Sequence, residues 1–157
     1  MNVILLCIGK TDEKSMEEMI VKYEKRLPKH WNYQRIEIPD PKNRKNLSES
    51  QQKTKEAESI LSKIDSGDWV ILLDERGKQW TSVHFANELQ QFMNQSIKQL
   101  VFVIGGPYGF ADEVYARANQ KMSLSSMTFT HQMVRLFLTE QLYRAFAILQ
   151  GNPYHHE

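Results

Sequence analysis

Short apolar segments alternate with longer amphipathic ones along the whole chain, and this alternation constrains the fold more than any other feature. Residues 3–8 form a continuous apolar run ended by Gly9, as expected of a buried strand. A helix that Thr11 or Asp12 can cap follows, and Pro28 stops it. Further strands are expected at 33–38, 69–73, 100–104 and 122–124, and further helices at 51–64, 82–94, 111–119 and 131–150. Such alternation predicts an α/β fold with a mostly parallel sheet.

The sequence is organised as one unit. It contains no internal repeat and no linker that would divide it, so a single domain over residues 1–157 is predicted. The segment 40–50, "DPKNRKNLSES", is polar and rich in turn formers, and is the best candidate for a mobile loop. The single Cys7 lies in an apolar strand, which favours a core residue in a reducing cytoplasm over a nucleophile.

Charge and hydropathy limit the classes of partner. The amino-terminal segment lacks the basic region and cleavage site of a signal peptide, and no apolar run approaches the roughly 20 residues that span a bilayer. We therefore expect a soluble cytoplasmic protein without a membrane partner. The net charge of +1 does not by itself indicate a nucleic-acid binder. An RNA site would have to be a local patch or be assembled from two subunits.

A glycine-rich turn follows the predicted strand at 100–104. In "VFVIGGPYGF", the strand leads into Gly105, Gly106 and Gly109, and a helix begins with acidic residues. In parallel α/β sheets, ligands bind beyond the carboxyl ends of strands, where glycines let backbone approach them. A tight turn that needs positive φ angles explains the glycines equally well. A dinucleotide site is disfavoured, because the spacing is G-G-x-x-G and the expected acid about 20 residues further on is missing.

The segment 122–146 precedes and forms the last helix. Small hydroxyl residues interleave with apolar ones at 123–130, a pattern that suits an adenosine-like ligand but is also common in polar capping loops. The helix carries an apolar stripe through Val134, Leu138 and Leu142, and Phe137 and Tyr143 widen it. A helix on one side of a small sheet needs only one stripe. The extra apolar surface predicts a homodimer interface, with deeper burial in the monomer as the alternative.

The carboxyl-terminal tail contains a histidine pair. Gly151 can cap the last helix and Pro153 prevents its continuation before Tyr154, His155 and His156. Terminal histidines are commonly disordered or remnants of a tag. No cysteine or carboxylate cluster accompanies them, so no metal site is predicted.

Together these segments closely resemble the RlmH (YbeA-like) family of SPOUT-class methyltransferases over essentially the whole chain. The shared motifs are "ILLCIGK" at 4–10, "EKRL" at 24–27, "FVIGGPYG" at 102–109, "MSLSSMTFTHQMVRLFLTEQLYRA" at 122–145 and the closing G-x-x-YHH. The combination is specific, although no single motif is. One departure is Thr130, where the family usually has proline before His-Gln.

The resemblance implies a SPOUT-type α/β fold whose carboxyl-terminal segment forms a trefoil knot, an exception to the rule that chains are unknotted. It also implies that the loops of the knot bind S-adenosylmethionine, and that the protein acts as a homodimer on ribosomal RNA, a large ribosomal subunit or the whole ribosome. The residues implied to bind the cofactor are Leu73, Gly105, Leu124, Ser125, Ser126, Met127, Thr128 and Phe129.

The implied activity is methyl transfer to N3 of a pseudouridine in large-subunit (23S) ribosomal RNA. Catalysis would then depend on positioning and on removal of the N3 proton, without a metal. Candidate catalytic residues near the pocket mouth are His131, Arg135, Tyr154 and His155. For Arg135 a plain surface charge is the alternative. Two other functions stay open: a non-catalytic ribosome-binding protein that retains the knot, and a different nucleotide-dependent enzyme.

Overall fold

The structure is a computed structural model that describes residues 1–156. Its centre is a five-stranded sheet with the order β2-β1-β4-β3-β5, in which all four neighbouring pairs are parallel. The strands are β1 (Asn2–Ile8), β2 (Gln34–Ile38), β3 (Trp69–Gln79), β4 (Gln99–Ile104) and β5 (Gln120–Ser123). The predicted α/β fold with a mostly parallel sheet is confirmed.

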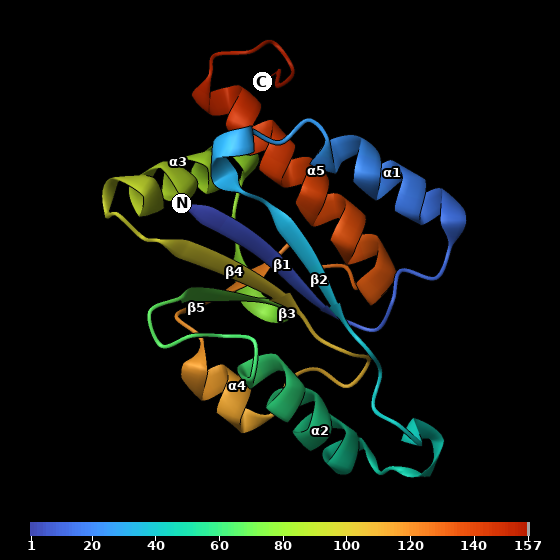
Figure 1. Ribbon diagram of the computed structural model, residues 1–157. Helices are drawn as coiled ribbons and strands as arrows, with labels where there is room; N and C mark the ends of the chain where they lie inside the picture. Colours follow the sequence, from blue (N-terminus) through green and yellow to red (C-terminus); the bar gives the residue numbers. More distant parts are fainter. Residues whose placement is uncertain (157) are drawn as a thin grey trace.

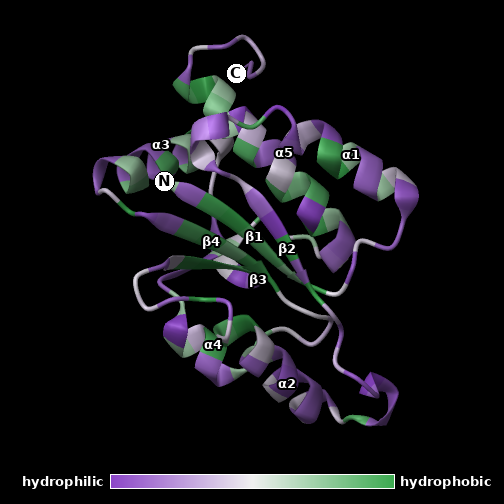
Figure 2. Cartoon of the chain, in the orientation of Figure 1, coloured by the Kyte–Doolittle hydropathy of each residue, from purple (hydrophilic) through white to green (hydrophobic). Residues whose placement is uncertain are grey.

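Helices cover both faces of this sheet, as Figure 1 shows. One face carries α1 (Lys14–Glu24), α3 (Ser82–Asn94) and α5 (His131–Leu149), and the other carries α2 (Glu49–Leu61) and α4 (Asp112–Arg117). Two 3-10 turns, at Lys29–Trp31 and Arg44–Asn46, flank β2. Because both faces are covered, the central strands β1 and β4 and the first half of β3 are mostly apolar, whereas the edge strand β2 is partly hydrophilic (Figure 2).

The two faces of the sheet bury separate apolar clusters. Alternate residues of β1 divide between them, so that Leu5 packs towards α3 and α5 while Leu6 packs towards α2 and α4. Cys7 is fully buried in the first cluster, and this burial raises the pKa of its thiol to about 12. The prediction of Cys7 as a core residue is therefore confirmed.

Strand β3 is longer than the sequence predicts. We expected it to end at Leu73, because the residues that follow, "DERGKQ", are polar. In the structure the ladder to β5 is interrupted after Leu73 and resumes at Lys78, and Met122 is the partner of both residues. A Cβ atom on Gly77 would lie 2.5 Å from the Met122 carbonyl carbon, so only glycine permits this backbone approach. The trefoil knot itself stays a prediction.

Helix α5 has neighbours on both sides. It packs against α1 and α3 as well as on the sheet. The ring of Phe146 lies 5.8 Å from that of Trp31, and the ring of Tyr143 lies 6.3 Å from that of Tyr23. Part of the wide apolar surface is thus buried within one chain, and the homodimer stays a prediction. Across residues 1–156, no helix combines the length and apolar character required to cross a bilayer.

A candidate ligand site at the carboxyl ends of the strands

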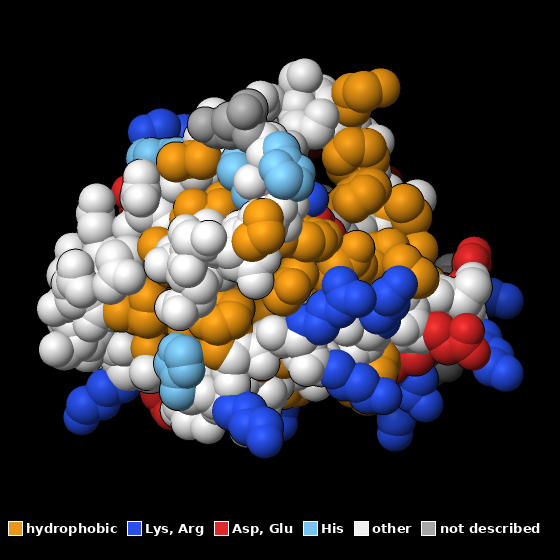
Figure 3. All heavy atoms as spheres, turned by 90° about the horizontal axis from the view of Figure 1, so that it is seen from above, with side chains coloured by type: hydrophobic (Ala, Val, Ile, Leu, Met, Phe, Trp, Pro, Cys, Tyr) orange, Lys and Arg blue, Asp and Glu red, His pale blue; other side chains and the backbone are white. Residues whose placement is uncertain are grey.

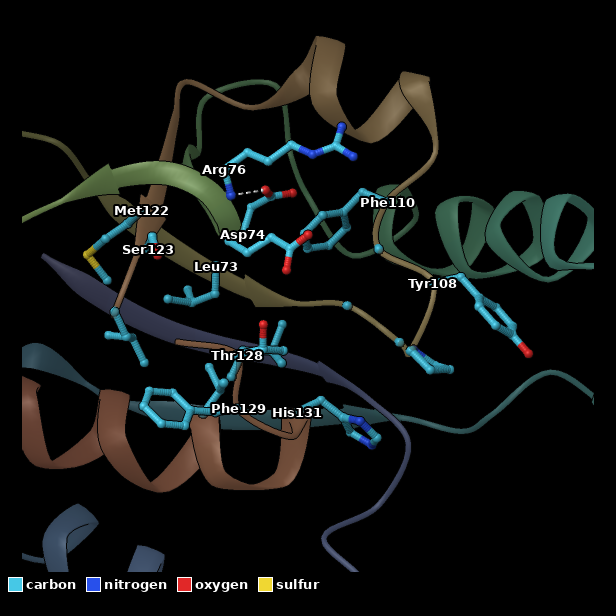
Figure 4. A pocket seen from close by; sticks show the side chains of 18 of the residues that line it. Leu73, Asp74, Arg76, Tyr108, Phe110, Met122, Ser123, Thr128, Phe129 and His131 are labelled. Atoms are coloured by element: carbon cyan, nitrogen blue, oxygen red, sulfur yellow. Dashed lines mark hydrogen bonds between the residues drawn. The ribbon is translucent and has the colours of Figure 1, made fainter. Parts of the chain in front are cut away.

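A cavity of about 710 Å³ lies beyond the carboxyl ends of the central strands, beside the start of α5. Three segments form its walls: the 74–76 excursion of β3, the 105–110 turn after β4, and the 124–130 segment after β5 (Figure 4). Its volume falls in the roughly 300–1,000 Å³ range of small-molecule sites. Its position is also the one at which parallel α/β sheets bind ligands.

The glycine turn of this cavity is tightly packed from behind. A Cβ atom on Gly105 would lie 2.9 Å from the ring of Phe110, and one on Gly106 would lie 2.5 Å from a carboxylate oxygen of Glu56. Neither glycine has a positive φ, whereas Gly109 does, at +77°. The first two glycines are therefore required for space, and only the third for its backbone conformation.

Glu56 supports this turn from α2 and was not singled out in the sequence. Its side chain is buried, accepts a hydrogen bond from Gln52 Nε2 at 2.9 Å and faces the backbone N–H of Gly106. Burial raises the pKa of its carboxyl group. The sequence does contain a sign of this role, because Glu56 is a charged residue on the apolar side of the predicted helix, which it shares with Ala57 and Ile60.

The segments predicted to bind a cofactor converge on this cavity. The lining residues include Leu73, Gly105, Leu124, Ser125, Met127, Thr128 and Phe129. Ser126 is not one of them within the described chain. The Ser125 hydroxyl accepts a hydrogen bond from the Met127 backbone N–H at 3.0 Å, and its carbonyl accepts one from the Ser123 hydroxyl at 2.8 Å. These bonds hold the segment in a turn at the wall of the cavity.

Acidic and basic residues on the other wall were not predicted. Asp74, Glu75, Arg76 and Lys53 all line the cavity. The Tyr115 hydroxyl donates a hydrogen bond to Asp74, which also accepts one from the Arg76 backbone N–H at 2.8 Å. Burial and the adjacent Asp74 carboxylate raise the pKa of Tyr115 to about 12. The tyrosine is therefore protonated at neutral pH, and its hydrogen bond fixes the position of the Asp74 carboxylate at the cavity wall.

His131, the first residue of α5, also lines the cavity. Burial and the positive charge of Arg135 lower the pKa of its imidazole. The ring is therefore neutral at pH 7 and retains one nitrogen that can accept a proton.

Arg135 lies away from the pocket mouth, contrary to our expectation. Its side chain is fully buried, and its guanidinium donates to the Ile8 carbonyl at 2.7 Å and to the Thr11 hydroxyl at 3.0 Å. Glu37 lies 3.5 Å from the same group. Neither a phosphate contact nor a surface charge fits this burial, so Arg135 connects α5 to β1 and β2.

We expected Tyr154 and His155 to lie near the mouth of the cavity. In the structure, both residues instead contact α5 of their own chain. The Tyr154 hydroxyl donates to Glu140 at 3.0 Å, and a ring nitrogen of His155 lies 3.3 Å from Arg144. These contacts hold the tail against the carboxyl-terminal half of α5, whereas His131 lies at its amino end. Glu140 and Arg144 follow His131 by nine and thirteen residues, which corresponds to about 14 and 20 Å along the helix axis. In one chain, Tyr154 and His155 are therefore remote from His131.

Comparison with known proteins agrees with this arrangement. The family model described as "Predicted SPOUT methyltransferase" matches residues 1–155. A protein from Flavobacterium johnsoniae is 59% identical over 157 residues, covering 100% of both chains. One from Christiangramia forsetii is 57% identical over 156 residues, covering 99% of both. Both are named "Ribosomal RNA large subunit methyltransferase H".

A solved structure supports the fold independently. A probable methylase family protein from Haemophilus influenzae Rd KW20 superposes with a TM-score of 0.57 at 12% identity, covering 99% of this chain and 71% of that one. The family model and the relatives extend over nearly the whole length, and the cavity lies on the segments that carry the shared motifs. The chain belongs to the SPOUT methyltransferase family.

Proposed function

We propose that this protein transfers a methyl group from S-adenosylmethionine to N3 of a pseudouridine in large-subunit (23S) ribosomal RNA. The observation that carries the proposal is the cavity, because its walls are the segments through which the chain resembles methyltransferases of this substrate class. Relatives that are 57% and 59% identical over nearly their full lengths bear the corresponding name.

The lining of the cavity fits S-adenosylmethionine. Leu73, Ile104 and Leu124 provide apolar surface for an adenine ring, and the backbone of the 124–129 segment provides hydrogen-bonding groups for its edge. The carboxylates of Asp74 and Glu75 suit the ribose hydroxyls or the positive charges of the cofactor. When bound, the cofactor supplies a methyl group on a sulfonium, which leaves as a neutral thioether.

The protein's own contribution would be to orient the base, exclude water and accept one proton. His131 lines the cavity with a lowered pKa, so its neutral imidazole can take the N3 proton while N3 forms the new bond to the methyl carbon. Tyr108, Met127 and Phe129 surround the same opening with 45%, 73% and 37% of their surfaces exposed. Such exposed apolar side chains at a cavity mouth suit an unstacked base.

We further propose that the enzyme is a cytoplasmic homodimer whose substrate is ribosomal RNA within a subunit or ribosome. Figure 3 shows hydrophobic side chains gathered across the face formed by α1, α3 and α5, with basic residues beside them. A second chain on this face could bring its own tail to the cavity of the first. Tyr154 and His155 would then act in the neighbouring site.

The decisive test is methyl transfer to ribosomes from a strain in which the corresponding gene is deleted. We expect tritium from labelled S-adenosylmethionine to enter large-subunit RNA, and mass spectrometry to find one methylated pseudouridine. A protein that binds ribosomes but shows no calorimetric signal with the cofactor would instead be a non-catalytic binding protein. Thermal protection by NAD in place of S-adenosylmethionine would indicate a different nucleotide-dependent enzyme.

Truncation before Tyr154 tests the role of the tail. We expect the shortened protein to fold and to bind S-adenosylmethionine with nearly unchanged affinity, because none of residues 154–156 lines the cavity of its own chain. Methyl transfer to ribosomes should be abolished. Full activity would show that the tail has only a structural role at the end of α5.

A further inference from the structure

Two segments of this chain are strongly basic, residues 22–35 and residues 41–55. Residues 41–55 contain five basic side chains and a single carboxylate, Glu49. The whole chain has 20 Lys and Arg against 19 Asp and Glu, so the rest of the molecule is net acidic. Residues 22–35 also contain five Lys and Arg against one carboxylate, but none of them lines the cavity, whereas Lys53 does. A polyanion would be attracted to both segments, and 41–55 is the basic segment beside the cavity.

This basic segment lies at the cavity end of the molecule. It leaves β2 at its carboxyl end, contains the Arg44–Asn46 turn and continues into α2, and Figure 1 shows it projecting from the body of the protein. Lys53, on the second turn of α2, lines the cavity itself. Arg44 and Asp40 are also close enough to His131 to influence its pKa. The segment therefore forms one side of the approach to the cavity.

The basic side chains of the segment are available to a ligand. Lys42, Arg44 and Lys45 are exposed. Among residues 1–156, these three form a single ion pair, between Arg44 and Asp40 at 3.2 Å. No carboxylate of residues 1–156 forms a salt bridge with Lys42, Lys45 or Lys53. Unpaired lysines near one another repel, which favours occupation by a shared anion.

The backbone of the segment holds these charges in place. Ser48 and Gln51 form reciprocal capping bonds of 3.0 and 3.1 Å at the start of α2. The 3-10 turn begins after Asn43, which adopts a left-handed φ of 57° that asparagine tolerates. Lys42 and Lys45 thus project from a folded turn with a defined conformation.

We propose that Lys42, Arg44, Lys45 and Lys53 bind consecutive phosphates of the RNA strand that carries the methylated nucleotide. This inference rests on the proposed ribosomal RNA substrate. Lysines act on phosphates as point charges and carry no base specificity, so they would set the register of the strand while the cavity selects the base. Of these four residues, Lys42, Arg44 and Lys45 lie in or beside the projecting turn, and Lys53 lies at the cavity wall.

Two double variants with the same loss of charge test the proposal. Lys42→Gln with Lys45→Gln changes the basic segment, and Lys63→Gln with Lys98→Gln changes two exposed lysines near the amino ends of β3 and β4. Binding to a labelled fragment of large-subunit RNA is measured by fluorescence anisotropy at several salt concentrations. For the first variant we expect weaker binding, and a salt slope reduced by about 1 for each lysine removed. The control should match the wild type.

Cofactor calorimetry on both variants completes the test. We expect unchanged affinity for S-adenosylmethionine. Equal RNA affinities for the two variants, or a loss confined to cofactor binding, would overturn the proposal. Methyl transfer by the wild type is assayed separately. Its absence would count against the proposed function, while the anisotropy titration would still decide whether Lys42 and Lys45 bind RNA.

Discussion

At the scale of single residues, the shape of the cavity depends on the absence of side chains at Gly105 and Gly106. Gly105 leaves room for the Phe110 ring, and Gly106 leaves room for the Glu56 carboxylate. A side chain at either position would displace a group that shapes the turn. This differs from the sequence argument, in which the glycines admitted a ligand, because the groups they accommodate belong to the protein itself.

Gly105→Val should reduce affinity for S-adenosylmethionine more than it reduces stability. Valine would displace the Phe110 ring, itself a lining residue, and so change the shape of the cavity wall. Calorimetry with the cofactor and circular dichroism on the same sample measure the two effects. Gly67→Val is the matched control, since no atom lies within 4 Å of the added Cβ. Unchanged affinity in a folded Gly105→Val protein would remove this turn from the site.

Glu56 should make stability depend on pH in an unusual direction. Because burial raises its pKa above the usual 4.5 in the folded state, its contribution is greatest below pH 4.5 and is lost as the pH rises through the raised value. Glu56→Gln should remove this dependence and leave the protein relatively more stable at neutral pH. Thermal unfolding between pH 4 and 8 measures it, with the exposed Glu58→Gln as control. Parallel pH profiles for wild type and Glu56→Gln would contradict the argument.

At the scale of elements, the start of α5 is fixed by the loop after β1. Gln132 Nε2 donates to the Lys10 carbonyl at 2.9 Å, and Arg135 donates to Ile8 and Thr11 one turn further along. The same helix turn carries His131 and follows the 124–130 wall of the cavity. Contacts between residues more than 120 positions apart therefore set the position of the site.

Arg135→Ala should destabilise the protein strongly. It would remove the hydrogen bonds that the buried guanidinium donates to Ile8 and Thr11 and leave a cavity in its place, at a cost of about 2–5 kcal/mol. Urea denaturation followed by circular dichroism measures this loss. The exposed Arg26→Ala should cost much less. Similar midpoints for the two variants would mean that the buried guanidinium contributes little to holding α5.

The sequence predicts those elements best whose pattern is local. Helix α3 spans Ser82–Asn94 as expected, because Thr81 caps it and its apolar residues recur at helical spacing. The second half of β3 was missed because its polar residues read as a turn, and the pairing with β5 that makes it a strand is not local. Arginine is rarely buried, so the burial of Arg135 could not be predicted without knowing that Ile8 and Thr11 lie beside it.

The convergence of the predicted cofactor residues on one cavity has a related reason. Gly105 and Leu124 each follow a parallel strand, and Leu73 lies where the ladder of β3 is interrupted. Such positions meet at one edge of the sheet, whatever the order of the strands. The tail had no comparable constraint. Its position depends on contacts with Glu140 and Arg144 that no periodic pattern indicates.

At the scale of the whole molecule, the homodimer is the main prediction. Phe137→Glu and Tyr143→Glu would each place a charge on the partly exposed face of α5, where a buried interface would leave it unpaired. Sedimentation should then show monomer or aggregate in place of dimer. Cofactor calorimetry serves as the control for Phe137, whose ring lies 5.0 Å from that of Phe129 at the cavity. A soluble dimer with both substitutions would mean that the interface lies elsewhere.

The order of the strands has a consequence for biosynthesis. Strand β1, the first to leave the ribosome, lies between β2 and β4, so one of its edges has no partner until residue 104 has been translated. The wall of the cavity is completed later still, by residues up to Val134. A nascent chain therefore has no complete ligand site until residue 134 has been translated, and a shorter translation product cannot compete with the finished protein for its ligand.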